Sequence, residues 1–180
     1  MSNETARFAA ISCTHVPYHN VAAIDRLCEH LATWELTDFV LLGDLFEAAA
    51  VSLHGDSHPH VLHDEYAAAA ALLEQIESAL PQTCKLHWLL GNHDDNIQIN
   101  DSRRTDPRIR EMMHWSYSPF ARTFAKWTQY PYRKPSIHNQ DGMLRLGQVC
   151  FIHGFQAGLT SDNNEAKRMR FALGGVPHLL

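Results

Sequence analysis

Short runs of apolar residues recur along the first half of the chain, and each run is about as long as one buried strand. Residues 8–11, 39–42 and 86–90 are almost wholly apolar and are flanked by polar residues. A short, continuous apolar run bounded by polar segments is typical of a strand that is covered on both faces. The pattern therefore predicts three buried strands.

Between these runs the apolar residues take the spacing of amphipathic helices. Residues 21–31 place apolar side chains on one helical face, and Asn20 stands at the N-cap position. A second helical pattern covers residues 69–80, and Pro81 ends it. Strands that alternate with helices at this spacing predict a mixed α/β fold whose sheet is at least partly parallel.

The second half of the chain breaks this alternation. Residues 102–134 are punctuated by prolines and predict a basic helical insertion of one or two helices. Residues 143–152 predict a strand, with a hairpin turn through Asp141-Gly142 before it. A last apolar run begins at residue 172. Because no linker or repeat interrupts the chain, we expect residues 1–180 to form one domain.

Composition narrows the class of protein. The chain is 45% hydrophobic and 19% charged, which excludes a disordered or collagen-like chain. It contains no apolar run of about 18 residues, so no membrane-spanning helix is expected. The first eight residues lack an apolar secretory core, and the four cysteines form no CxxC pair. These features favour a soluble, cytoplasmic protein with reduced thiols.

Charge and histidine content add a hint of chemistry. Residues 1–101 carry 3 basic and 15 acidic side chains, whereas residues 102–180 carry 12 basic and 5 acidic ones. The first part of the chain is therefore suited to cations, and the second part to anions. Thirteen histidines beside 15 Lys and Arg residues also invite a metal hypothesis, since histidine is a common metal ligand.

Polar clusters with metal-ligating side chains follow four of the apolar runs. The carboxyl ends of neighbouring parallel strands open into one crevice, so these clusters would converge there. Each of them alone is a weak signal, since turns and hydrogen-bonded histidines also follow strands, but four in succession favour a site for Mn, Fe, Zn or Ni. The clusters are Cys13-Thr14-His15, Gly43-Asp44-Leu45-Phe46-Glu47, Gly91-Asn92-His93-Asp94 and His153-Gly154.

These motifs, in this order, resemble the calcineurin-like metallophosphoesterase superfamily. The resemblance covers residues 11–154, and Gly-Asn-His-Asp at 91–94 is its most specific part. It implies an α/β (α+β) fold in which a β-sandwich is flanked by helices in four layers. It also implies hydrolysis of phosphomonoesters or phosphodiesters, nucleotides and nucleic acids among them, by water activated between two divalent metal ions.

The resemblance also implies a role for each motif residue. Asp44 would bridge the two metals, His15 would bind the first, and Asn92 and His153 would bind the second. An aspartate between two cations holds them at the spacing that phosphoryl transfer needs.

Other motif residues would act on the substrate. His93 would face the scissile phosphate, stabilise its developing charge and assist the leaving group. Asp94 would orient His93, and Glu47 would lie beside the metals without binding them.

Two features depart from the family pattern. Cys13 occupies the position of the usual first aspartate, and it is either a ligand suited to Zn or Fe or a plain buried thiol. The late Gly-His-x-His motif does not occur, since the only histidine after His153 is His178. We therefore expect the fold to be incomplete at the C-terminus, with one ligand of each metal lacking.

The basic segment has two interpretations. Its arginines, Arg103 and Arg104 above all, could contact a substrate phosphate, and its aromatic residues could stack on nucleic-acid bases. Alternatively, it forms an amphipathic cap with buried aromatics and a solvated basic face, which we favour. The segment's aromatic residues are Trp115, Tyr117, Phe120, Phe124, Trp127, Tyr130 and Tyr132.

The sequence thus predicts a metallophosphoesterase that acts on a phosphate ester with two divalent metal ions. Two alternatives remain open: a catalytically impaired or truncated relative that acts as a binding scaffold, and a basic nucleic-acid-binding module.

Overall fold

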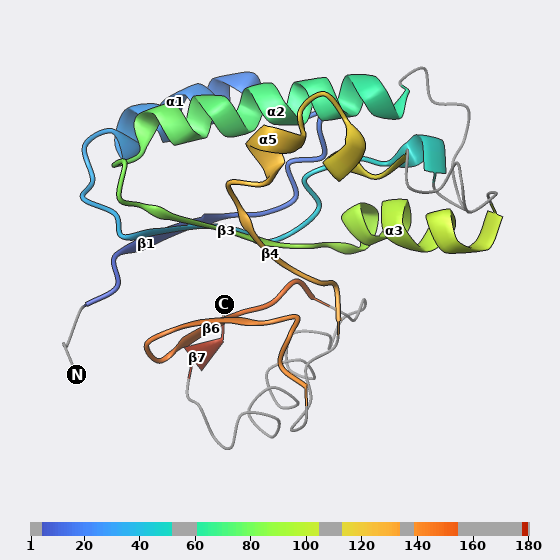
Figure 1. Ribbon diagram of the computed structural model, residues 1–180. Helices are drawn as coiled ribbons and strands as arrows, with labels where there is room; N and C mark the ends of the chain where they lie inside the picture. The colour runs from blue at the N-terminus through green and yellow to red at the C-terminus, as the bar shows by residue number, and fades with distance from the viewer. Residues whose placement is uncertain (1–4, 52–60, 105–112, 134–138, 155–177, 180) are drawn as a thin grey trace.

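Four parallel strands form the larger of two sheets (Figure 1). They are β1 (Phe8–Ile11), β2 (Asp38–Leu41), β3 (Lys85–Leu89) and β4 (Thr128–Tyr130), in the spatial order β1-β2-β3-β4. The first three confirm the predicted strands to within one residue at each end. All four run in the same direction, so the loops that follow them gather at one edge.

This computed structural model describes residues 5–51, 61–104, 113–133, 139–154 and 178–179. In this part of the chain no helix is both long enough and apolar enough to cross a membrane.

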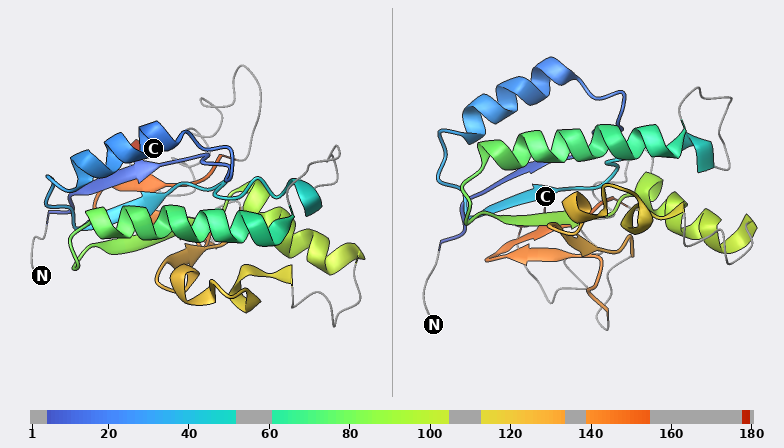
Figure 2. Two further views of the ribbon diagram at one scale, coloured as in Figure 1. Left: turned by 90° about the horizontal axis from the view of Figure 1, so that it is seen from above. Right: turned by 45° about the horizontal axis from the view of Figure 1, so that its top comes forward.

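Helices cover one face of the larger sheet. The helices α1 (Val21–Leu31) and α2 (Leu62–Ala79) lie side by side across it, and Figure 2 shows this from above. The predicted cap is present, because the side chain of Asn20 accepts a hydrogen bond of 3.1 Å from the backbone N–H of Ala23. Further helical elements in the described part of the chain are η1 (Ala49–Val51), α3 (Asn92–Arg104), η2 (Trp115–Tyr117) and α5 (Ala121–Phe124).

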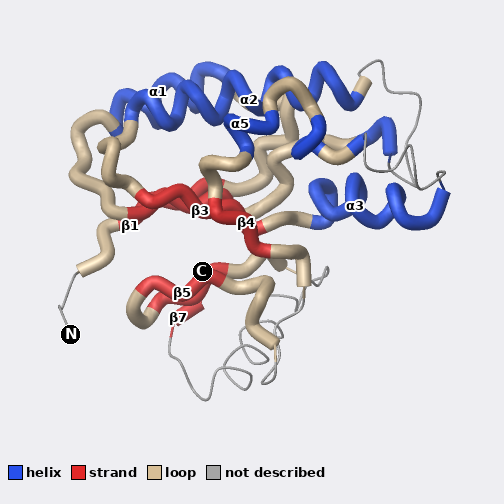
Figure 3. The backbone as a smooth tube through the Cα atoms, viewed as in Figure 1, coloured by secondary structure: helices blue, strands red, loops and turns tan. Residues whose placement is uncertain are grey.

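The second sheet lies against the opposite face of the first (Figure 3). It consists of β5 (Leu144–Leu146), β6 (Val149–Phe151) and β7 (His178–Leu179). Strand β6 pairs antiparallel with β5 and parallel with β7. A buried cluster between the sheets includes Val40, Leu89 and Phe151. The expected β-sandwich flanked by helices is therefore confirmed, and the described residues form three of its four expected layers.

The prediction of a single strand over residues 143–152 was wrong, because the segment forms two strands. The chain reverses after Leu146, and β5 and β6 form a hairpin with Gly147 and Gln148 between them. Gly147 has a φ of +61°, in the left-handed region that side chains other than glycine rarely adopt. The predicted turn at Asp141-Gly142 is also present, because the backbone N–H of Met143 donates to the carbonyl of Gln140 at 3.1 Å.

The predicted helical insertion at 102–134 also needs correction. Its last part, β4, is an edge strand of the larger sheet and pairs with β3. The aromatic residues Trp115, Phe124 and Trp127 are fully buried in the core under the helices. These three rings cannot stack on nucleic-acid bases, as the interpretation as a cap expects, whereas Tyr117 of the same segment is 63% exposed.

An aromatic cluster centred on Phe46 joins these elements. The ring of Phe46 is fully buried, and its centroid lies 5.7 Å from that of Trp88 and 5.6 Å from that of Trp115. Tyr66 and Phe124 contact the same ring at 5.2 and 5.8 Å. Because Phe46 lies two residues after Asp44, the packing of this ring fixes the loop after β2.

We expect Phe46→Ala to lower the free energy of unfolding by about 3–5 kcal/mol, since it leaves a cavity among four rings. Urea denaturation measures this change. Trp34→Ala is the control, because 51% of Trp34 is exposed and little apolar burial is lost there. Equal destabilisation by the two variants would show that the Phe46 cluster does not hold the core.

Candidate active site

The loops that follow β1 and β2 run side by side beyond the ends of their strands. The backbone N–H of Cys13 donates to the carbonyl of Gly43, and that of His15 donates to the carbonyl of Asp44, both at 3.0 Å. The parallel pairing of β1 with β2 thus continues into the loops. It brings the first two predicted clusters together.

The backbone of these loops is strained. Cys13, His15, Asp44 and Ala48 have φ values of +55°, +46°, +54° and +53°, and they are the only residues other than glycine with positive φ in the described part of the chain. A side chain in this region costs roughly 1 kcal/mol or more and persists only where the surroundings hold it. Such strain gathers at functional sites, and here it aims the candidate ligands into one place.

Two glycines allow the loops to approach one another. A Cβ atom on Gly91 would collide with the backbone and carboxylate of Asp44. One on Gly43 would lie 2.7 Å from the Cα of Gly91 and would also collide with the ring of His153. The close packing of the two loops therefore requires glycine at positions 43 and 91.

Asp44 occupies the centre of the site and is only 5% exposed. One carboxylate oxygen, Oδ1, accepts a hydrogen bond of 3.0 Å from the backbone N–H of His93. The other, Oδ2, lies 3.8 Å from Nε2 of His15 and 3.3 Å from Nε2 of His153. Burial alone would raise the pKa of Asp44, but the hydrogen bonds from His153 and His93 and their positive charge outweigh it and lower the pKa.

Three acceptor oxygens, from Leu42, Asp44 and Asn92, surround the imidazole ring of His153. Nδ1 of His153 lies 2.5 Å from the carbonyl of Leu42, which can only accept, so Nδ1 donates. Nε2 of His153 then faces Oδ2 of Asp44 and, at 3.2 Å, Oδ1 of Asn92. Burial opposes a charge on this imidazole, but the contacts with Asp44 and Leu42 prevail and raise the pKa of His153. Such a set attracts a positive charge, and its oxygen and nitrogen donors fit a divalent transition metal.

A second group of donors also includes Asp44. Donor atoms of Cys13, His15 and Asp44 lie within 4.8 Å of one another. Nδ1 of His15 is 2.9 Å from the carboxylate of Glu47, which orients the ring so that Nε2 faces Asp44. Cys13 is exposed, so the structure does not support a plain buried thiol. Thiolate, imidazole and carboxylate together fit Zn or Fe.

Glu47 is more central than the sequence suggested. Besides its bond to His15, its carbonyl lies 2.6 Å from Nδ1 of His93. Donor atoms of His15, Glu47 and His93 also lie within 4.8 Å of one another, and the two imidazole rings meet edge to face at 4.6 Å. Since Nδ1 of His93 donates to a carbonyl, Nε2 is the ring atom left for a substrate.

Asp94 has a different position from the one expected. It is fully buried and accepts hydrogen bonds from the backbone N–H groups of Gly91 at 2.9 Å and Phe46 at 3.1 Å. Burial raises its pKa to about 6. The described contact that orients the His93 ring comes from Glu47, so Asp94 ties the loops after β2 and β3 together instead.

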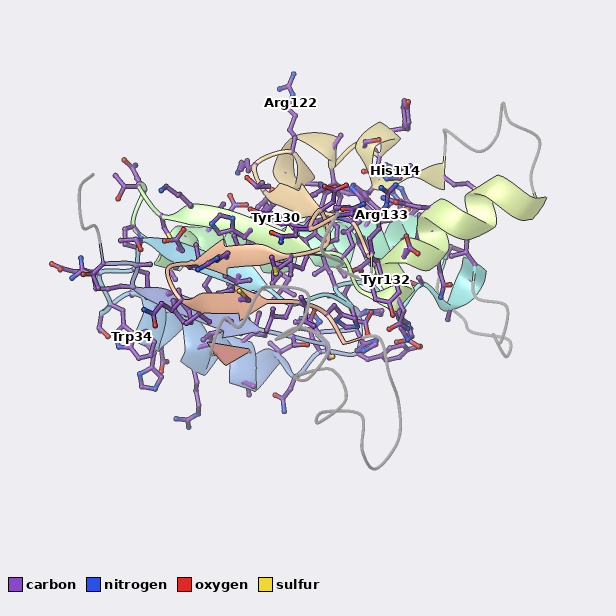
Figure 4. The ribbon with its side chains drawn as sticks, turned by 90° about the horizontal axis from the view of Figure 1, so that it is seen from below. Trp34, His114, Arg122, Tyr130, Tyr132 and Arg133 are labelled. Carbon is purple, nitrogen blue, oxygen red and sulfur yellow. The ribbon has the colours of Figure 1, made fainter. Side chains whose placement is uncertain are left out.

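Two pairs of residues remain to be placed, namely the predicted phosphate contacts Arg103 and Arg104 and the two residues Tyr132 and Arg133 after β4. Arg103 and Arg104 end α3, but their side chains lie outside the described residues. The sequence indicated Tyr132 only as an aromatic residue of the basic segment, whereas its ring lies 5.8 Å from that of His153. It gave no role to Arg133, whose charge acts to lower the pKa of Asp95 against the rise due to burial. Figure 4 labels both of them beside the same strand-end loops. Recognition of β4 as a strand would have indicated them.

Comparison with known proteins agrees with this geometry. The family model for calcineurin-like phosphoesterase matches residues 6–171. No curated protein and no solved structure gives a significant match. The matched range includes every residue of the candidate site, so the chain belongs to the calcineurin-like phosphoesterase family of metal-dependent phosphate-ester hydrolases.

Proposed function

We propose that this chain hydrolyses phosphate esters, either monoesters or diesters, at the site centred on Asp44. The observation that carries the proposal is that the Asp44 carboxylate lies close to two sets of metal-type donors. Cys13 and His15 form one set with it, and His153, which also contacts Asn92, lies beside its Oδ2 atom. A shared carboxylate of this kind is what a two-cation phosphoesterase requires.

The donor sets divide the work of metal binding. Cys13, His15 and Asp44 would hold one divalent cation, and Asp44, Asn92 and His153 would hold the other. When bound, such cations supply charge neutralisation for the phosphate and Lewis-acid activation of water. The hydrogen bonds of His15 to Glu47 and of His153 to Leu42 fix which nitrogen of each ring is the ligand atom.

His93 is the residue that would act on the substrate. Its backbone N–H is fixed by Asp44 and its Nδ1 by the carbonyl of Glu47, so the ring cannot turn without breaking a hydrogen bond. Its Nε2 is then held in place to donate a hydrogen bond to a phosphate oxygen or a proton to the leaving oxygen. A group positioned in this way requires no rearrangement during the reaction.

The alternatives receive less support. A scaffold would not need four strained backbone positions and a buried carboxylate facing two histidines. A nucleic-acid-binding module that stacks bases would need several exposed rings, but Trp115, Phe124 and Trp127 are buried, and Tyr117 is the large exposed ring among the described residues of this segment. Nucleotides and nucleic acids remain possible substrates because both contain phosphate esters.

Asp44→Asn tests the proposal directly. We expect manganese-stimulated hydrolysis of bis-p-nitrophenyl phosphate to fall by about 100-fold or more, because the shared carboxylate is removed. Bound metal should be lost as well. Activity and metal content are measured on the same samples. Asp64→Asn, an exposed aspartate at the start of α2, is the matched control. Unchanged activity in Asp44→Asn would contradict the proposed site.

His93→Ala separates catalysis from metal binding. We expect kcat to fall about 100- to 1,000-fold while the metal content stays near that of the wild type, because a charge-stabilising donor is lost. His30→Ala, an exposed histidine on α1, serves as the control. If metal and activity disappear together in His93→Ala, His93 is a ligand instead.

Cys13→Asp tests the metal preference. A thiolate favours Zn or Fe, whereas a carboxylate favours Mn or Mg, so the variant should need less Mn²⁺ than the wild type for half-maximal activity. Cys84→Ser, which changes a thiol outside the site, should leave the Mn²⁺ requirement unchanged. The same Mn²⁺ requirement in Cys13→Asp and the wild type would show that residue 13 is not a ligand.

A further inference from the structure

A second candidate site lies at the opposite edge of the larger sheet. A groove of about 520 Å³ opens where β1, β2 and β3 begin, beside the turn between β5 and β6. In Figure 3 this is the end of the sheets near the N-terminus, away from α3. Its volume falls within the range of about 300–1,000 Å³ that small-molecule sites occupy.

Basic side chains are concentrated in this groove. Arg7, Lys85 and Arg145 all line it. The first 101 residues contain only three basic side chains, Arg7, Arg26 and Lys85, in a segment with 15 acidic ones. Two of those three thus meet at one place, where β5 brings Arg145 from the basic part of the chain.

Two of the three cations are available to a ligand. Lys85 is exposed, and neither it nor Arg145 has an ion pair among the described residues. Arg145 donates from Nε to the carbonyl of Gly147 at 2.9 Å, which anchors the side chain while its terminal nitrogens stay available. Arg7 forms an ion pair with Glu35 at 3.0 Å, but this pair is weak because both side chains are well exposed.

The polar lining suits an anion. Among the described residues that line the groove, Asp38 is the only carboxylate, and it is 4% exposed. Its two oxygens are taken up by Nε2 of His87 at 2.9 Å and the hydroxyl of Thr37 at 2.7 Å. Thr5 and Thr83 add exposed hydroxyl groups that donate readily to phosphate oxygens.

The floor of the groove is held rigidly by backbone hydrogen bonds. The N–H of Thr37 donates to the carbonyl of Arg7 at 2.8 Å, and the N–H of Lys85 donates to the carbonyl of Thr37 at 2.9 Å. The starts of three strands are therefore tied together before any ligand binds. A site formed in advance loses little entropy on binding.

We propose that this groove binds a phosphate-bearing small molecule of nucleotide size. Arg145 would take the phosphate through its planar guanidinium, Lys85 would add a point charge, and Ala6 and Leu146 offer apolar contact to the rest of the ligand. The site is separate from the one proposed for hydrolysis and does not depend on it, because it uses the amino ends of the strands.

Titration calorimetry of the full chain with ADP, and separately with inorganic phosphate, tests this proposal in the presence of EDTA. Chelation removes metal-dependent binding at the Asp44 site. We expect saturable ADP binding with a Kd below about 1 mM, and competition by inorganic phosphate. Arg145→Ala and Lys85→Ala should each weaken ADP binding about ten-fold, and Arg145→Lys should weaken it less.

Arg122→Ala is the matched control, because Figure 4 shows Arg122 projecting from α5 away from the sheets. It should bind ADP like the wild type. Thermal unfolding of each variant checks that the fold is kept. The proposal is overturned if no saturable binding occurs up to about 10 mM ADP, or if a folded Arg145→Ala, Lys85→Ala double variant binds normally. It is also overturned if only His93→Ala abolishes binding, since the ligand then occupies the hydrolytic site.

Discussion

The carboxylate of Asp44 is the point at which three strand-end loops meet. It accepts from the backbone of His93 after β3, lies beside His15 after β1 and faces His153 after β6. A buried carboxylate in a low-dielectric setting needs such partners, since an unpaired charge there would be costly. The same contacts that keep Asp44 ionised therefore assemble the metal donors around it. Stability and chemistry depend on one group.

A second buried carboxylate, that of Asp94, holds the loop that packs against Asp44. Asp94 accepts from the backbone of Phe46 and Gly91, and Trp88 lies within 3.4 Å of it. Its pKa rises to about 6, first because it is buried and further because the charge of Asp44 is near, although its donors act to lower it. Asp94 is thus a hydrogen-bonded hub between the aromatic cluster at Phe46 and the glycine that touches Asp44. Within Gly-Asn-His-Asp, Asp94 is the member whose described contacts are structural.

The sequence predicted the parts of this arrangement that depend on continuous apolar runs. Strands β1 to β3 are such runs, and their direction and the clusters after them followed from the strand–helix alternation. Strand β4 was missed because Thr128–Tyr130 is short and lies at a sheet edge, with two of its three residues exposed. The exposure of Cys13 and the turn of Asp94 toward the core depend on backbone angles and long-range hydrogen bonds. No residue pattern encodes these directly.

The parallel sheet also gives the molecule two chemically different ends. Every loop at the carboxyl ends of β1 to β3 carries histidine, cysteine or carboxylate donors, and these gather at the Asp44 site. The amino ends carry Arg7 and Lys85, and the β5–β6 hairpin adds Arg145 there. Since opposite ends of parallel strands cannot share a loop, the two sets of charges stay apart. A cation-binding edge and an anion-binding edge can therefore coexist in a small domain without neutralising one another.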